Sequence, residues 1–395
     1  MKLLGGILLI IGTSIGGGLL ALPVSTSQIG FLNSSLLLFG CWVVMTLGAF
    51  LILEVNLWMP SNSNMISMAK ATLGKWGQLV AWITYILLLY SLLAAYIAGG
   101  SDFLGNLLNK YSLGLPGWSV SLLFTLILGT VVFHGIKSID IVNRFLMFLK
   151  MGSYFLLIFL MVKHVTLEKL SGGSIRYMTT GITVAITSFG YATIIPSLRC
   201  YFHNDIKKLR LAILIGSFIP LVTYILWDLT VMGIIPRLGD NGLIEMLHSG
   251  HSNSEVINVL STLLQKDVIT SFAEIFTGVC LLTSFLGVAL CLSDFLSDGL
   301  KIEKTGLGNW FIQSLTLIPS LIVVLFYPGA FISALSYAGI YCVILLVLLP
   351  VLMVWYGRYR KNISNGYRVF GGKPLLVILM IISVLLIIQG ISGSF

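Results

Sequence analysis

Long apolar segments alternate with short polar ones along almost the whole of this chain. Each apolar segment has roughly the 18 to 25 residues that an α-helix needs to cross a lipid bilayer. A membrane-spanning barrel would show apolar and polar residues alternating over about ten positions, and the segments lack that pattern. We predict eleven spanning helices, near residues 3–31, 34–58, 78–105, 118–134, 142–163, 178–199, 208–233, 268–297, 309–327, 329–356 and 374–392.

The composition also indicates an all-α integral membrane protein. Hydrophobic residues make up 57% of the 395 positions and charged residues only 9%, with a mean hydropathy of +1.01. A soluble domain carries about 25% charged residues, so this chain cannot build a water-soluble surface. The first apolar segment is too long for the core of a signal peptide and no cleavage motif follows it, so we expect it to remain as the first span.

The distribution of basic residues sets the expected orientation. The net charge is +9, and most lysines and arginines fall in the loops that would share a side with the N-terminus. Because Lys and Arg accumulate on the cytoplasmic side of membrane proteins, we place the N-terminus inside and, after eleven spans, the C-terminus outside. The positive charge is therefore no sign of nucleic-acid binding.

The segment at residues 234–267 is a long polar loop on the expected outer side. Within it, residues 254–265 have an amphipathic helical pattern that suits a lid over the outer mouth. His248 and His251 lie three positions apart, but two ligands on a loop are weak grounds for a metal site. The five cysteines show neither zinc-binding nor disulfide spacing, so we expect no metal and no cofactor.

The stretch GTSIGGGLLALP, residues 12–23, lies in the middle of the first apolar segment. One interpretation is close helix packing, for which Gly12 and Gly16 have a suitable spacing. The three successive glycines at 16–18 point in three directions, however, and each weakens a helix by about 1 kcal/mol relative to alanine. The other interpretation is a helix that is broken at mid-membrane and exposes its backbone groups to a cavity.

A second interruption, ITSFGYATIIPS at residues 186–197, has the same order of small polar residues, glycine and proline. Broken helices at equivalent positions predict two five-helix repeats, residues 1–163 and 178–356. Because five is odd, the second repeat is inserted upside down. This is the pattern of the LeuT-like transporter fold, with helices 1 and 6 discontinuous and residues 374–392 as an extra eleventh helix.

The two breaks predict a binding site for an amino-acid zwitterion. The positive N-terminal end of a half-helix attracts a carboxylate, and freed carbonyl groups attract an ammonium. We expect the carboxylate at the main chain of the first break and the ammonium at carbonyls of the second. The candidate residues are Thr13, Ser14, Ile15, Gly16, Gly17, Gly18, Ser188, Phe189, Gly190 and Tyr191.

These and further stretches resemble the bacterial hydroxy/aromatic amino acid permeases, nearest the tyrosine-specific branch. The further stretches are LYSLLAAYIAGG (89–100), NRFLMFLK (143–150), TSFLGVALCLSDFLSD (283–298), YPGAFISALSYAG (327–339) and GYRVFGGKP (366–374). The resemblance implies proton-driven import of an aromatic amino acid across the inner membrane, with the C-terminus in the periplasm. Tyrosine is the expected substrate, and tryptophan or phenylalanine is the alternative. The chain departs from the family at Ala192 and Thr193, which stand where His-Gly is expected.

The resemblance also implies roles for side chains. Tyr90 and Ala94 lie on one stripe of the third span, and Tyr90 and Phe189 are expected to close over the substrate ring. Lys150 matches the fifth-span lysine that replaces a sodium ion in sodium-independent members of the wider superfamily, beside Thr283 and Ser284 of the eighth span. Proton release from this ammonium would couple transport to H⁺. The alternative is a sodium ion at the eighth span, with the lysine reaching back to the interface.

Several charged residues receive lesser roles. Glu54 ends the second span and is expected at the membrane interface, and Asp294 and Asp298 with Lys301 are expected to form a cytoplasmic gate. An enzyme would need clustered titratable groups or a nucleophile with its base, which the sequence lacks. A channel would not need two broken helices. We therefore expect a transporter that acts as a monomer and whose partners are the amino acid and the lipid bilayer.

Overall fold

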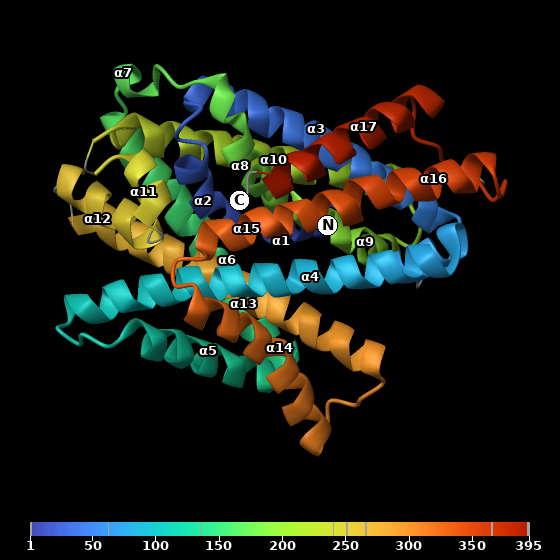
Figure 1. The fold of residues 1–395 in the computed structure, drawn as a ribbon, viewed down its shortest axis with the longest axis horizontal. Helices are drawn as coiled ribbons and strands as arrows, with labels where there is room; N and C mark the ends of the chain where they lie inside the picture. Colours follow the sequence, from blue (N-terminus) through green and yellow to red (C-terminus); the bar gives the residue numbers. More distant parts are fainter. Residues whose placement is uncertain are drawn as a thin grey trace.

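The computed structural model describes residues 2–61, 63–134, 136–239, 241–249, 252–264, 267–364 and 366–392, which form helices and no strand (Figure 1). The helices are α1 (Lys2–Ser14), α2 (Gly17–Ser25), α3 (Phe31–Leu57), α4 (Met65–Lys110), α5 (Gly117–Phe133), α6 (Ile136–Met161), α7 (Leu167–Leu170), α8 (Met178–Ser188), α9 (Ile195–Tyr201), α10 (Ile206–Ile234), α11 (Leu243–Ser249), α12 (Ser252–Leu264), α13 (Asp267–Leu300), α14 (Gly306–Phe326), α15 (Phe331–Val343), α16 (Leu349–Tyr359) and α17 (Gly372–Ser392). Short 3₁₀ turns lie at Val162–His164, Ile175–Tyr177 and Gly190–Ile194, and a π-helical turn at Ile344–Leu348 joins α15 to α16.

The predicted all-helical membrane fold is confirmed. Within the described ranges, nine helical stretches are long and apolar enough to cross a membrane, and α1 with α2 form one further span that is bent by 51°. The remaining predicted span, 118–134, coincides with α5, which has only 17 residues. The total of eleven spans and the division into two five-helix repeats therefore stay predictions.

α4 is longer than the predicted span 78–105 because a basic, partly exposed segment precedes it. The chain kinks at Gly74, whose φ of +79° lies in the left-handed region that favours glycine. Before the kink, a capping box between Asn64 and Ser67 starts the helix. After the kink, the apolar part of α4 packs against α13 and α15.

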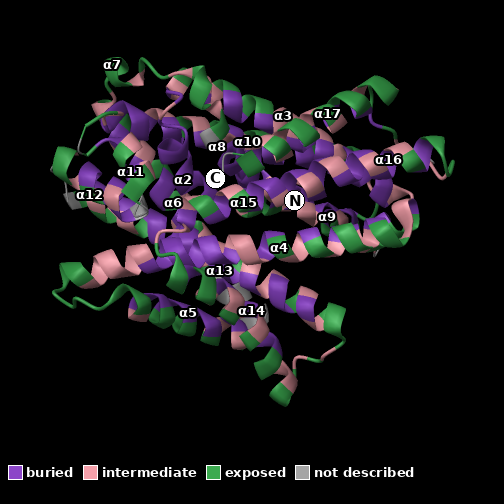
Figure 2. Cartoon of the chain, viewed as in Figure 1, coloured by how far each residue is buried: buried purple, intermediate pink, exposed green. Residues whose placement is uncertain are grey.

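The two interrupted helices pack against several other helices of the bundle. α10 packs against α1 and α3, and α8 packs against α2 and α15. All nine residues of α2 are buried, whereas α5, α14 and α17 show many exposed residues on their outward faces (Figure 2). Backbone groups without helical partners are tolerated at membrane depth only in such protein-lined places, so this packing permits the breaks.

The amphipathic helix predicted at 254–265 is present as α12. It packs against α13 and α4, and its hydrophilic first turn is fixed to α4. Asp102 of α4 accepts hydrogen bonds from the Ser254 N–H (3.1 Å) and from the Ser254 hydroxyl (2.8 Å). A carboxylate at the first turn also suits the positive end of the helix dipole, so these bonds anchor α12 to the C-terminal part of α4.

Candidate functional site

The first break lies between α1 and α2, where Gly16 has an extended backbone (φ −154°, ψ −150°). Because each glycine of the triplet lacks a Cβ, a different side chain can lie close to the backbone at each position. A Cβ at Gly17 would lie 2.6 Å from the ring of Tyr96. A Cβ at Gly18 would lie 2.6 Å from Ser188 Oγ. The glycines therefore serve both functions considered for them: they interrupt the helix, and they let α4 and α8 approach its bare backbone.

The second break follows Ser188, where α8 gives way to the 3₁₀ turn Gly190–Ile194 before α9 begins. A tyrosine of α10 joins the two breaks. The hydroxyl of Tyr224 lies 2.7 Å from the Ser14 carbonyl oxygen and 2.7 Å from the Ser188 carbonyl oxygen. Because a hydroxyl has one hydrogen, it satisfies only one of these carbonyls at a time. At least one carbonyl at the junction is thus available to another donor.

A cavity of about 380 Å³ lies between the two breaks and the helices α4 and α13. This volume falls within the range of about 300–1,000 Å³ that is typical of small-molecule sites. Its walls combine backbone and hydroxyl groups with apolar side chains: Leu8, Leu9, Gly12, Thr13, Ser14, Gly16, Gly18, Tyr85, Leu88, Leu89, Leu92, Tyr96, Met147, Thr187, Ser188, Gly190, Thr193, Ile194, Thr283, Ser284, Gly287, Val288, Cys291 and Cys342. Eight of the predicted site residues are in this set, namely Thr13, Ser14, Gly16, Gly18, Ser188, Gly190, Thr283 and Ser284.

The cavity is open toward the end of the bundle where α1 begins. Leu8 and Leu9, on the wall nearest that end, are 52% and 49% exposed. At the opposite end the fully buried α2 closes it off from the other side of the bundle. Exposed side chains thus stand at one end of this cavity and buried residues at the other.

The first break has the charge pattern that was predicted for a carboxylate. The N–H groups in the first turn of α2 have no partner within their own helix, and the helix dipole makes this end positive. The Gly17 N–H donates to Ser284 Oγ at 3.1 Å, which attaches α13 to the break. Ser284 was predicted as part of an ion site, and the structure places it directly against the backbone of the break.

Lys150 of α6 lies between α1 and α13, as predicted. Its side chain is only 1% exposed, and its Nζ donates to the Ile15 carbonyl oxygen (2.6 Å) and to Thr283 Oγ1 (3.3 Å). Ile15 directly follows the last residue of α1, where the negative end of the helix dipole stabilises a cation. The alternative in which Lys150 extends to the membrane interface is therefore wrong for this conformation.

Tyr90 and Ala94 do not line the cavity, which corrects their expected placement. The Tyr90 hydroxyl donates to the Leu315 carbonyl of α14 at 2.7 Å, and Ala94 is buried outside the cavity wall. The wall residues of α4 instead follow the stripe 85, 88, 89, 92 and 96. At about 100° per residue, positions 90 and 94 lie roughly 140–180° around the helix from this stripe.

Phe189 and Tyr191 also point away from the cavity, so the expected gate between Tyr90 and Phe189 is not formed. Phe189 is fully buried, with its ring centroid 5.1 Å from that of Tyr224. The Tyr191 hydroxyl donates to Thr46 Oγ1 of α3 at 3.1 Å. The 3₁₀ turn at the second break directs both rings into the packing against α10 and α3.

Sequence reasoning missed the side chains that form most of the apolar wall. They come from the stripe of α4, from α13 and from α15, and include Tyr85, Leu88, Leu89, Leu92, Tyr96, Val288, Cys291 and Cys342. The i, i+3, i+4, i+7 spacing of the α4 residues was a usable signal, but α4 is apolar on all sides. Of the two residues that replace His-Gly, Thr193 lines the cavity and Ala192 is fully buried.

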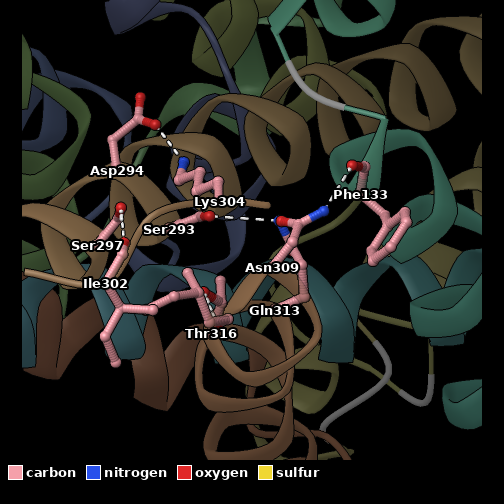
Figure 3. A network of polar contacts seen from close by, with 10 residues as sticks. Phe133, Ser293, Asp294, Ser297, Ile302, Lys304, Asn309, Gln313 and Thr316 are labelled. Carbon is pink, nitrogen blue, oxygen red and sulfur yellow. Dashed lines mark hydrogen bonds and ion pairs between the residues drawn. The ribbon is translucent and has the colours of Figure 1, made fainter. Parts of the chain in front are cut away.

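The expected gate at the end of α13 has a different lysine from the one predicted. Asp294 forms an ion pair with Lys304, whereas Lys301 turns the chain with a φ of +57° (Figure 3). Behind this pair the Gln313 amide donates to Ser293 Oγ at 3.3 Å, which joins α14 to α13 (Figure 3). Asp294 lies one helical turn beyond Cys291 of the cavity wall, but neither Asp294 nor Lys304 lines the cavity itself.

No metal site is visible in the described part of the chain. It contains no group of three or more His, Cys, Asp or Glu side chains that could hold an ion. His248 lies at the end of α11, and His251 lies outside the described residues.

Comparisons with known proteins identify the family. The model of the tryptophan/tyrosine permease family matches residues 1–389. The tyrosine-specific transport system 1 of Haemophilus influenzae is 35% identical, and the match covers 98% of this chain and 95% of that protein. A tryptophan-specific transport protein of the same organism is 31% identical, with 100% of this chain and 96% of that protein covered.

The fold has a counterpart among solved structures. The crystal structure of MhsT in complex with L-phenylalanine superposes with a TM-score of 0.65 over 99% of this chain and 98% of that chain, at 15% sequence identity. At this identity the likeness concerns the fold alone, and it confirms the predicted LeuT-like arrangement. This chain belongs to the tryptophan/tyrosine permease family and is a membrane transport protein rather than an enzyme.

Proposed function

We propose that this permease is a proton-coupled symporter that imports tyrosine across the inner membrane of a bacterium by alternating access. The observation that carries the proposal is the bond from Lys150 Nζ to the Ile15 carbonyl oxygen. Ile15 directly precedes the glycines proposed to hold the substrate, so proton and substrate act on the same turn of the chain.

The substrate docks through its two backbone charges. Its carboxylate lies at the N-terminal end of α2, where the positive end of the helix dipole favours an anion. Its ammonium lies toward the carbonyls of Ser14 and Ser188, which share the single hydrogen of Tyr224. Support for this pose comes from the cavity, whose wall contains both ends of the break.

Proton coupling follows from the position of the lysine. A protonated Lys150 binds the end of α1 and Thr283 of α13 together, and loss of the proton removes the charge that holds these carbonyl and hydroxyl oxygens. A substrate that favours one arrangement of the break then changes the proton affinity of Lys150. Because binding linkage is reciprocal, protonation changes the substrate affinity by the same factor.

The proposed direction of transport is inward. Basic residues concentrate in the loops on the side of the N-terminus, which supports a cytoplasmic N-terminus and, with eleven spans, a periplasmic C-terminus. The cavity opens toward the end where α1 begins, so this conformation would release substrate to the cytoplasm.

Tyrosine is proposed over tryptophan for two reasons. The tyrosine-specific relative has the higher identity, 35% against 31%. In addition, the wall of the cavity combines leucines with a polar pair in which the Tyr85 hydroxyl and Cys291 Sγ lie 3.2 Å apart. A phenol ring needs such an apolar pocket with a polar group at its end.

Uptake into liposomes tests this proposal. We expect purified protein in proteoliposomes to accumulate labelled tyrosine under an imposed proton gradient without sodium, in preference to tryptophan and phenylalanine. A gradient of about one pH unit, worth about 1.4 kcal/mol per proton, supports up to roughly tenfold accumulation at one proton per substrate. Liposomes without protein and liposomes with equal pH on both sides are the controls.

Two outcomes would contradict the proposal. Accumulation that follows a sodium gradient and ignores pH would assign the coupling ion to Na⁺ at Thr283 and Ser284. A lack of aromatic amino acid uptake under either gradient would reject the proposed substrate class.

A further inference from the structure

Asp228 is a buried carboxyl group outside the proposed substrate site. It lies in α10, one helical turn beyond Tyr224, where α10 meets the end of α2 and the start of α3. Its exposed fraction is 0%. Neither the substrate cavity nor the Lys150 contacts include it, so the proposed transport mechanism gives this residue no role.

Asp228 ends a chain of hydroxyl groups. Ser34 Oγ lies 2.6 Å from Asp228 Oδ2 and 3.0 Å from Thr26 Oγ1. Thr26 Oγ1 lies 2.7 Å from the Leu22 carbonyl oxygen, its nearest acceptor, and 3.5 Å from Asp228 Oδ2. Asp228 Oδ1 has no hydrogen-bond partner among the residues that the structure describes.

No cation in the described residues pairs with this carboxyl group. The basic side chains that the structure describes on the elements packed against α10 are engaged elsewhere: Lys150 with Ile15 and Thr283, Lys169 with the Ile234 carbonyl, Lys163 with the ring of Phe159, His164 with the Leu160 carbonyl, and Lys2 with His203. Tyr154 of α6 donates to the Thr223 carbonyl, and Glu54 of α3 pairs with Arg358. Tyr224, on α10 itself, contacts the Ser14 and Ser188 carbonyls. An ionised carboxylate here would be a buried and uncompensated charge, which is costly in a membrane interior.

The two protonation states of Asp228 give different arrangements of the hydrogens on Asp228, Ser34 and Thr26. With Asp228 ionised, the Ser34 hydroxyl is its one close donor and Oδ1 remains bare. With Asp228 protonated at Oδ2, the carboxyl donates to Ser34, Ser34 donates to Thr26, and Thr26 donates to the Leu22 carbonyl. Every hydrogen then has an acceptor at 2.6–3.0 Å. Oδ1 lacks a donor in both states, so the missing counter-charge is what favours the neutral acid, and Ser34 Oγ offers the added hydrogen an acceptor.

We infer that Asp228 is a second proton-binding site, separate from Lys150, which is occupied while α2 is closed against α3 and α10. Thr26 directly follows the last residue of α2 as its C-cap, and α2 is the fully buried half of the broken helix. The proton comes from water on that side as α2 closes, and it binds to Oδ2. When α2 moves away, water reaches the carboxyl and the proton returns to the same side.

This site therefore regulates the transporter and does not carry a proton across the membrane. A low pH on the outer side favours closure of α2, and a high outer pH favours the open arrangement. The place of this step in the transport cycle rests on the proposed function, but the protonation of Asp228 does not.

Infrared difference spectroscopy on the full-length protein in lipid tests the inference directly. We expect a carboxylic-acid carbonyl band at neutral pH without substrate, and its loss in Asp228→Asn. This variant should fold normally, because the asparagine amide can donate to Ser34 as the neutral acid does. Glu274→Gln, which alters an exposed pair with Lys110, is the matched control and should keep the band.

Uptake measurements add a second readout. We expect Asp228→Asn to keep tyrosine binding and Lys150-dependent accumulation under a proton gradient. With equal pH on both sides, it should lose the dependence of the tyrosine exchange rate on pH that we assign to Asp228. An unchanged band in Asp228→Asn would overturn the inference. The inference would also be overturned if sodium stabilised the wild-type protein against heat but did not stabilise Asp228→Asn, since that result would assign the site to a metal cation. Failure of tyrosine uptake alone would reject the proposed function and leave the infrared result standing.

Discussion

Replacing Lys150 with alanine or methionine is expected to abolish proton-driven accumulation of tyrosine. Both variants remove the ammonium that binds the Ile15 carbonyl and Thr283 Oγ1, and neither side chain can take up a proton. The tyrosine concentration inside proteoliposomes should then rise no higher than the concentration outside. Wild-type protein should reach up to roughly tenfold accumulation for a gradient of about one pH unit.

Exchange measurements separate a coupling defect from a folding defect. Lys150→Met keeps the length and apolar stem of the side chain, so it should still exchange labelled for unlabelled tyrosine when no gradient is present. Lys163→Ala, which alters an exposed lysine at the end of the same span, should accumulate tyrosine as the wild type does. If Lys150→Met accumulated tyrosine under a proton gradient, the assigned role of the lysine would be wrong.

Replacing Glu54 with glutamine is expected to destabilise the protein by about 3–5 kcal/mol, because it leaves a buried arginine without its counter-charge. Glu54 is fully buried in α3 and accepts two bonds from Arg358 of α16, at 2.7 and 2.5 Å. It also accepts from the Val369 N–H at 2.7 Å. The ion pair thus ties α3, α16 and the segment before α17 together, and its loss should lower the melting temperature in detergent markedly.

A double variant distinguishes the ion pair from simple side-chain packing. Glu54→Leu combined with Arg358→Met should be much more stable than Glu54→Gln, since an apolar pair of similar size replaces both charges. Asp205→Asn removes an exposed pair with Lys208 and should leave the melting temperature almost unchanged, because solvent screens that pair. Equal losses for the buried and the exposed pair would show that burial does not determine the effect.

The sequence predicted those features that depend on one continuous stretch of chain. The apolar segments located the helices because crossing a bilayer requires a minimum length, and the glycines at 16–18 located the first break because they weaken a helix. The position of Lys150 beside Thr283 followed from the family resemblance. These features needed no knowledge of how each helix is rotated.

Helix rotation and distant contacts could not be predicted in the same way. α4 is apolar on all sides, so its pattern did not distinguish the cavity stripe from the face that carries Tyr90. Glu54 was expected at the membrane interface because the sequence did not reveal its partner. Arg358 is 304 positions away and meets Glu54 only in the folded chain. Tyr224 gave no signal, because its function depends on two carbonyls that only the folded chain brings together.

Equilibrium binding of tyrosine and two of its analogues tests the central claim most directly. The claim is that the N-terminal end of α2 binds the carboxylate of an amino acid and that the carbonyls at the ends of α1 and α8 bind its ammonium. Tyramine lacks the carboxylate and 3-(4-hydroxyphenyl)propionate lacks the ammonium. Each should bind purified protein roughly 10- to 150-fold more weakly than tyrosine, as expected for losing a charged hydrogen bond of about 1.5–3 kcal/mol. Equal affinity for tyrosine and either analogue would contradict the claim.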